Sequence, residues 1–127
     1  MLFRSLAARA VIHAVSLDRD RRTSGAGIDA AVRSAMARAR EINATSIAFP
    51  ALGTGVGGYP LDEAARVTVQ AVRDELPASP SIQHVIFAMR GSAAYQAFEA
   101  AIAATAATAT EPPAASAERS SNRQPIA

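Results

Sequence analysis

Cysteine and lysine are both absent from this chain of 127 residues. Without cysteine there is no disulfide, no thiol nucleophile and no thiolate metal ligand, which fits a reducing compartment. All 13 basic residues are arginines, and 11 acidic residues are interspersed among them, so the net charge is only +2 and no basic stripe marks a nucleic-acid surface. No apolar run approaches the ~18 residues of a membrane span. We therefore expect a cytoplasmic protein that contacts neither membranes nor nucleic acid.

Glycine is scarce except in one segment, since four of the seven glycines lie in residues 49–60. This segment separates an apolar, strand-like run from an amphipathic stretch. Because glycine has no Cβ, it permits positive φ angles and lets consecutive N–H groups turn toward phosphate oxygens. The positive end of the following helix would add to this attraction. The segment predicts a ligand that carries phosphate.

Two familiar phosphate motifs fit this loop poorly. A Walker loop needs Lys and then Ser or Thr after its last glycine, where this chain has Tyr59 and Pro60. Residues 53–58 satisfy G-x-G-x-x-G, but a dinucleotide fold also needs an acidic residue at the end of the next strand. That strand ends in Met89 and Arg90. Neither a nucleotide triphosphatase nor a nicotinamide enzyme is favoured.

Apolar runs alternate with amphipathic stretches along the chain. We predict strands at residues 11–15, 45–49 and 82–89, and helices at residues 28–43 and 60–76. Ser24 is a candidate cap of the first helix, and a third helix is expected to bury Tyr95, Phe98 and Ile102. This order indicates a parallel α/β sheet with ligands beyond the carboxyl ends of its strands.

Residues 46–65 resemble the segment with which macrodomains embrace the diphosphate and distal ribose of ADP-ribose. Residues 11–15 resemble the strand one helix earlier in that family, and residues 85–87 with 95–98 resemble its closing strand and helix. The resemblance implies a three-layer α/β/α fold with a mainly parallel sheet. It divides the chain into a poorly defined lead (1–9), a partial macrodomain (10–102) and an Ala/Thr/Pro-rich tail (103–127) that we expect to be disordered.

The resemblance also implies site residues. The main-chain amides of residues 53–57 would hold the diphosphate, with the Thr54 hydroxyl as one further donor. Many macrodomains place an aromatic residue against the distal ribose where this chain has Gly57, so Tyr59 either replaces that contact or the contact is missing. On the adenine side the candidates are Met89 and Arg90, and Arg90 is either a stacking guanidinium or a surface charge. The full loop set is Gly53, Thr54, Gly55, Val56, Gly57, Gly58 and Tyr59.

Macrodomains carry their adenine-selecting aspartate, and the hydrolytic ones their catalytic loop, ahead of the strand that residues 11–15 resemble. This chain has only ten residues there, and none resembles those motifs. We therefore expect the C-terminal half of a macrodomain, with no assignable catalytic residue and with an exposed strand edge. His13 and His84 are read as structural, and neither a metal nor a cofactor is predicted.

Three functions stay open at this point. The first is binding of ADP-ribose, O-acetyl-ADP-ribose or a mono-ADP-ribosylated protein side chain. The second is a hydrolase that removes the acetyl or protein substituent from ADP-ribose. The third is a non-catalytic assembly protein or remnant that associates with itself through the exposed sheet edge.

Overall fold

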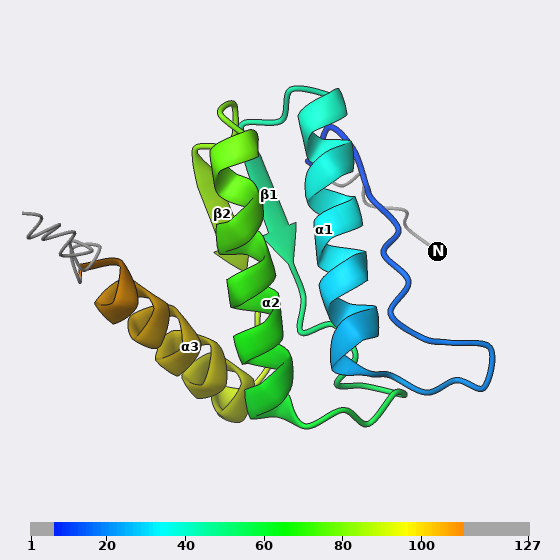
Figure 1. Ribbon diagram of the computed structural model, residues 1–127. Coiled ribbons are helices and arrows are strands. Elements are labelled where there is room, and N and C mark those ends of the chain that lie inside the picture. The colour runs from blue at the N-terminus through cyan, green and yellow to red at the C-terminus, as the bar shows by residue number, and fades with distance from the viewer. Residues whose placement is uncertain (1–6, 111–127) are drawn as a thin grey trace, which may run out of the picture.

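The computed structural model describes residues 7–110, which form three helices beside a small parallel sheet (Figure 1). In chain order the elements are α1 (Gly25–Glu41), β1 (Ser46–Phe49), α2 (Leu61–Glu75), the 3-10 helix η1 (Leu76–Ala78), β2 (His84–Phe87) and α3 (Ser92–Thr110). No helix in this part of the chain is long and apolar enough to cross a membrane.

The sheet has two parallel strands, with Ser46 opposite His84 and Phe49 opposite Phe87. α1 and α2 cover one of its faces, and side chains from both helices and both strands form the main core there. The parallel α/β architecture predicted from the sequence is confirmed. Within residues 7–110 only this one face carries helices, so the second helical layer of the expected sandwich is not among them.

α1 follows the sequence pattern closely. The Ser24 hydroxyl accepts a hydrogen bond from the Gly27 amide at 3.0 Å, which confirms Ser24 as the N-cap. The apolar positions from Ile28 onward are buried at helical spacing. The helix ends at Glu41, before the predicted residue 43, because Asn43 adopts a left-handed φ of 52°.

α2 begins one residue later than predicted, because Pro60 is its N-cap rather than its first helical residue. Its buried face consists mainly of small side chains, which allows α1 and α3 to pack on either side of it. Pro77 lies within η1, where a helix continues for one short turn before the chain enters β2.

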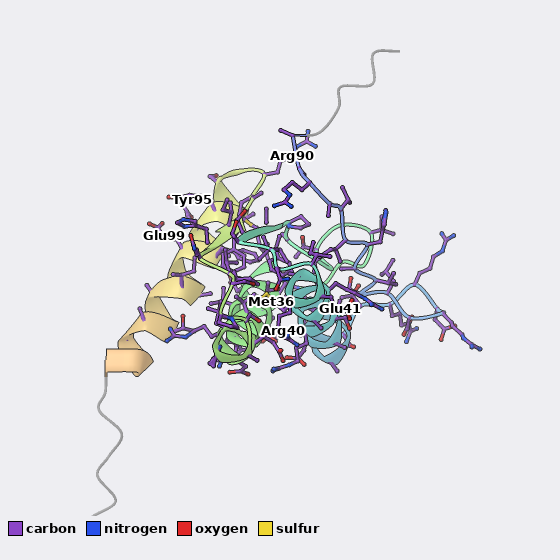
Figure 2. All side chains as sticks on the ribbon, turned by 90° about the horizontal axis from the view of Figure 1, so that it is seen from above. Met36, Arg40, Glu41, Arg90, Tyr95 and Glu99 are labelled. Atoms are coloured by element: carbon purple, nitrogen blue, oxygen red, sulfur yellow. The ribbon has the colours of Figure 1, made fainter. Side chains whose placement is uncertain are left out.

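α3 differs from the sequence prediction in two ways. Phe98 is buried and its ring centroid lies 5.3 Å from that of Phe87, but Tyr95 and Ile102 are 62% and 44% exposed. Figure 2 shows Tyr95 on the outer side of α3. The reason is that α3 packs mainly on α2, so only a narrow stripe of the helix is buried.

α3 also continues to Thr110, past the point at residue 103 where we expected the disordered tail to begin. Alanine has the highest intrinsic helix propensity, so an alanine-rich run can extend a helix without large apolar side chains. The rest of the predicted tail, residues 111–127, lies outside the described residues.

Residues 11–15 do not form the predicted strand. Their side chains alternate, with Ile12 and Ala14 half-buried and Val11 and Val15 62% and 76% exposed, as in an extended chain. A strand also needs a hydrogen-bonded neighbour, and none pairs with this segment within residues 7–110. The predicted strand at residues 11–15 is therefore wrong for the part of the chain that the structure describes.

The face of the sheet that no helix covers is apolar in part. Ile86 is 54% exposed there, and a groove of about 570 Å³ lies between the sheet and the extended lead at residues 7–12. Exposed apolar surface and free strand edges were expected from the sequence for a half-sheet.

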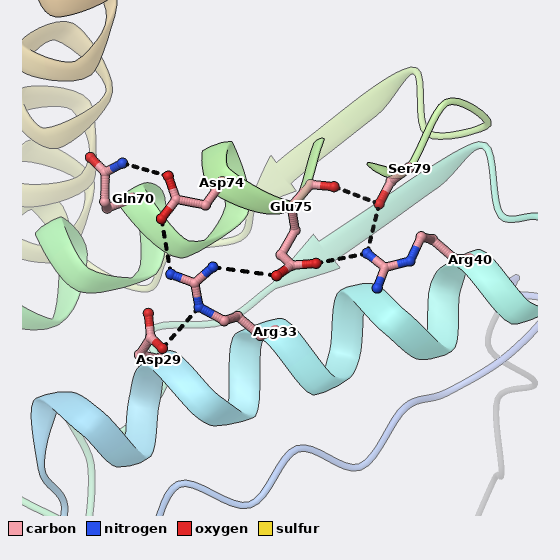
Figure 3. A network of polar contacts seen from close by, with 7 residues as sticks. All are labelled: Asp29, Arg33, Arg40, Gln70, Asp74, Glu75 and Ser79. Carbon is pink, nitrogen blue, oxygen red and sulfur yellow. Dashed lines mark hydrogen bonds and ion pairs between the residues drawn. The ribbon is translucent and has the colours of Figure 1, made fainter. Parts of the chain in front are cut away.

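A network of charged side chains joins α1 to α2 (Figure 3). Arg33 contacts Asp74 at 2.9 Å and Glu75 at 3.3 Å, and it also pairs with Asp29 on its own helix. Arg40 contacts the other oxygen of Glu75 at 2.8 Å. Hydrogen bonds from Arg40 and Arg33 hold the pKa of the Glu75 carboxyl below its usual value.

Replacing Glu75 by glutamine is expected to lower the free energy of unfolding at pH 7 by about 1 kcal/mol, because one carboxylate pairs with two arginines. A depressed folded-state pKa means that this stability is present above the ordinary value of 4.5 and is lost as the pH falls. Thermal melts of E75Q and wild type should therefore converge in acid. E99Q on exposed α3 is the control, and an equal loss in both variants would contradict a role for the network.

Candidate functional site

The loops that follow β1 and β2 leave the sheet at the same edge. Since Phe49 lies opposite Phe87 in parallel strands, residues 50–60 and residues 88–91 both begin there. α1 and α2 also begin at this end of the molecule, so the positive ends of two helix dipoles gather at it (Figure 1). Ligands of parallel sheets bind beyond the carboxyl ends of strands. The glycine loop thus lies at the carboxyl ends of the strands, where the helix N-termini favour binding of an anion.

The glycine loop, residues 50–60, leaves most of its predicted ligand amides free. Of the amides at residues 53–57 only that of Thr54 has a partner within residues 7–110, the Ala51 carbonyl at 3.4 Å. The Thr54 hydroxyl donates to the same carbonyl at 2.8 Å, so its proton is already engaged. Unbonded N–H groups remain at Gly53, Gly55, Val56 and Gly57. Three of them are consecutive, as a backbone anion site requires.

Two of the glycines are needed where the loop packs against the segment before α1. Gly53 has a φ of +80°, and a Cβ there would meet the methyl group of Thr23 and the side chain of Ile28. A Cβ at Gly57 would overlap the Thr23 hydroxyl and lie 3.0 Å from the Gly53 carbonyl. At Gly55, in contrast, a Cβ would meet nothing within 4 Å. One side of the loop is therefore tightly packed and the other is open.

Tyr59 connects the loop to both helix N-termini. Its side chain packs at the border of the main core, and its hydroxyl lies 3.5 Å from a carboxylate oxygen of Glu63 in the first turn of α2. A Cβ at Gly25, the first residue of α1, would lie 2.9 Å from the same hydroxyl. In this structure the ring of Tyr59 holds the loop in place.

The two residues predicted on the adenine side, Met89 and Arg90, differ in their burial. Met89 is half-buried and packs against the cluster between α2 and α3. Arg90 is exposed, and Figure 2 shows it at the margin of the molecule, away from the core residue Met36. Both follow β2 and so share the sheet edge with the glycine loop.

Thr23 lies against the candidate site, and sequence reasoning did not identify it. It precedes the cap of α1 and pairs with Leu17 in an isolated antiparallel bridge. Asp18 closes the intervening turn by accepting hydrogen bonds from the amides of Asp20 and Arg22 at 2.9 and 2.8 Å. The sequence around it is charged and carries no phosphate-binding pattern, so only the contact with two glycines identifies Thr23.

Residues 7–110 contain no group of three or more His, Asp or Glu side chains arranged to hold a metal ion.

Comparison with known proteins agrees with this architecture. An uncharacterized protein of Mycobacterium tuberculosis is 49% identical over 102 residues, which are 80% of this chain and 28% of that protein. A macro domain-containing protein of Streptomyces coelicolor is 38% identical over 96 residues, which are 75% of this chain and 55% of that protein. The chain thus spans less than two thirds of either relative.

Solved structures give the same result at the level of the fold. A macrodomain of Oceanobacillus iheyensis with ADP matches with a TM-score of 0.62 at 23% identity, over 66% of this chain and 44% of that one. A macrodomain of Trypanosoma brucei in complex with ADP-ribose matches with a TM-score of 0.59 at 26% identity, over 62% and 34%. The family model described as Macro domain matches residues 3–68. The chain belongs to the macro domain family.

Proposed function

We propose that this chain binds ADP-ribose through its diphosphate at the glycine loop. The observation that carries the proposal is the run of unbonded amides at Gly55, Val56 and Gly57, at a sheet edge where two helices begin. Macrodomains with ADP and with ADP-ribose are among its structural relatives. Free N–H donors and helix N-termini together favour phosphate over neutral ligands.

The two ends of the ligand would meet different side chains. On the adenine side, Met89 offers apolar contact and the exposed Arg90 offers a planar cation that can stack on a base. On the distal ribose side, Tyr59 is the aromatic residue of the loop, and its hydroxyl near Glu63 would be the polar group offered to the sugar.

Calorimetric titration of the 127-residue chain tests the proposal. ADP-ribose and ADP should both bind saturably, because both carry the diphosphate, whereas adenosine should bind much more weakly. Circular dichroism of the same sample establishes that the chain is folded. A folded chain that binds neither nucleotide, or that binds adenosine equally well, would refute a diphosphate site at this loop.

Hydrolysis of an ADP-ribose derivative is the enzymatic alternative, and it would require a general base near the distal ribose. The described carboxylate nearest to Tyr59 is Glu63, which also pairs with Arg66 at 3.2 Å on the exposed side of α2. Release of acetate from O-acetyl-ADP-ribose by wild type but not by E63Q would support this alternative over binding alone.

Self-association is the candidate from a third class. Within residues 7–110 one sheet face is uncovered, with Ile86 54% exposed, and each strand has a free edge, which favours pairing with a second copy of the chain. Light scattering would then report a mass that rises with concentration, and replacing Ile86 by lysine should reduce it. A constant monomer mass up to high concentration would exclude this role.

A further inference from the structure

The Thr23 hydroxyl oxygen is buried, and no group in residues 7–110 forms a hydrogen bond with it. A buried hydroxyl without a partner destabilises a fold, because its bonds to water are lost and not replaced. Such groups are rare in folded proteins and call for an explanation. Thr23 lies directly against the glycine loop, where a bound ligand would accept a hydrogen bond from its hydroxyl.

Thr23 fills the space that two glycines leave on the inner side of that loop. Its methyl group would clash with a Cβ at Gly53, and its hydroxyl would clash with a Cβ at Gly57. The bridge to Leu17 and the capped start of α1 hold its backbone on either side. The hydroxyl therefore has a defined position against the Gly57 backbone, whose amide has no partner within residues 7–110.

Two backbone hydrogen bonds, from Gly58 to Gly55 and from Tyr59 to Gly53, close the loop over Thr23, but side-chain packing does not hold its outer part. Val56 is 88% exposed, and a Cβ at Gly55 or Gly58 would meet nothing within 4 Å. A bound anion that drew the amides of residues 55–57 outward would also uncover the hydroxyl beneath them. Hydroxyl and amides are then donors to the same ligand.

We propose that Thr23 is a binding residue of the anion site, whose hydroxyl donates to a phosphate oxygen held by the amides of residues 55–57. This inference rests on the proposed function. It explains why the hydroxyl has no partner in the free protein: the group gains its hydrogen bond only when the ligand is present, and this gain adds to the binding free energy.

The valine variant T23V separates this role from a structural one. Valine keeps the branched shape and removes the polar atom, so the free protein should melt at an equal or slightly higher temperature. Affinity for ADP and ADP-ribose should fall about tenfold or more, because a hydrogen bond to a charged group is lost. A residue that served only to pack the loop would not combine unchanged stability with weaker binding.

T68V is the matched control. Thr68 is fully buried in α2, and its hydroxyl also lacks a partner among the described residues. Its replacement should leave stability equal or higher, and it should not change nucleotide affinity. The serine variant T23S, which keeps the hydroxyl, should bind within a few-fold of wild type even if it is less stable.

Titration of wild type, T23V, T23S and T68V with ADP and ADP-ribose decides between the outcomes. Weaker binding of both nucleotides by T23V alone supports the inference. If wild type and T23V bind equally, the inference is wrong and the proposed function stands. If T23S loses as much affinity as T23V, the hydroxyl is not the relevant group. If folded wild type binds neither nucleotide, both proposals are refuted.

Discussion

Replacing Gly55 by glutamate is expected to reduce ADP-ribose affinity by about 100-fold or more, while the melting temperature changes little. A Cβ at Gly55 meets nothing within 4 Å, and its φ is not left-handed, so the larger side chain fits without strain. Its carboxylate, however, would stand among the free amides where the diphosphate is proposed to bind. Placing like charges together costs several kcal/mol, which corresponds to the expected loss.

The glutamine variant G55Q has nearly the size of glutamate but no charge, so it measures the effect of side-chain size alone. The alanine variant G55A measures the effect of replacing glycine by the smallest side chain. We expect G55A to bind like wild type and G55Q to fall between G55A and G55E. Higher salt should reduce the difference between G55Q and G55E, because exposed charges are screened. Equal affinity of G55E and wild type would show that the diphosphate does not lie at this loop.

Replacing Gly57 by alanine should damage the loop itself, in contrast to the same change at Gly55. The new methyl group would overlap the Thr23 hydroxyl and press on the Gly53 carbonyl. Inserting a methyl group into packed structure typically costs 1–3 kcal/mol, which we expect as a lower melting temperature. ADP-ribose affinity should fall about tenfold or more, because the displaced loop no longer presents its amides together.

The double variant G57A/T23A provides the decisive control for this clash. Removing the Thr23 hydroxyl relieves the shortest of the contacts with the new methyl group, so part of the stability lost in G57A should return. Nucleotide affinity should not return with it, since the proposed hydroxyl donor is then missing. If G57A has the same melting temperature and the same ADP-ribose affinity as G55A, the packing of Thr23 does not constrain the conformation of the loop.

Local patterns in the sequence were sufficient to predict α1, α2, β1 and β2. Ser24 as a cap, the helical spacing from Ile28 and the β-rich run before Pro50 all act over a few residues, so they can be recognised without knowing the partners. The order of strands and helices then placed the glycine loop at the carboxyl edge of a parallel sheet, as the register of β1 and β2 confirms.

Predictions that depended on a partner were less accurate. Residues 11–15 have the composition of a strand but no ladder within residues 7–110, and Tyr95 has helical spacing but no element covering it. Both errors share one cause, which is that an apolar residue is buried only where another element reaches it. Likewise, nothing in the sequence around Asp74 and Glu75 indicated that these two carboxylates would pair with Arg33 on another helix.

The sequence by itself determined the α/β class of this protein and the segment that predicts an anion site, because glycine content, helix caps and apolar period are local properties of the chain. Only the tertiary structure decided which amides of that segment are free, why Gly57 cannot carry a side chain, and that Thr23 lies beneath the loop. The physical reason is that Thr23 and Gly57 are far apart in sequence, and the fold alone brings them into contact.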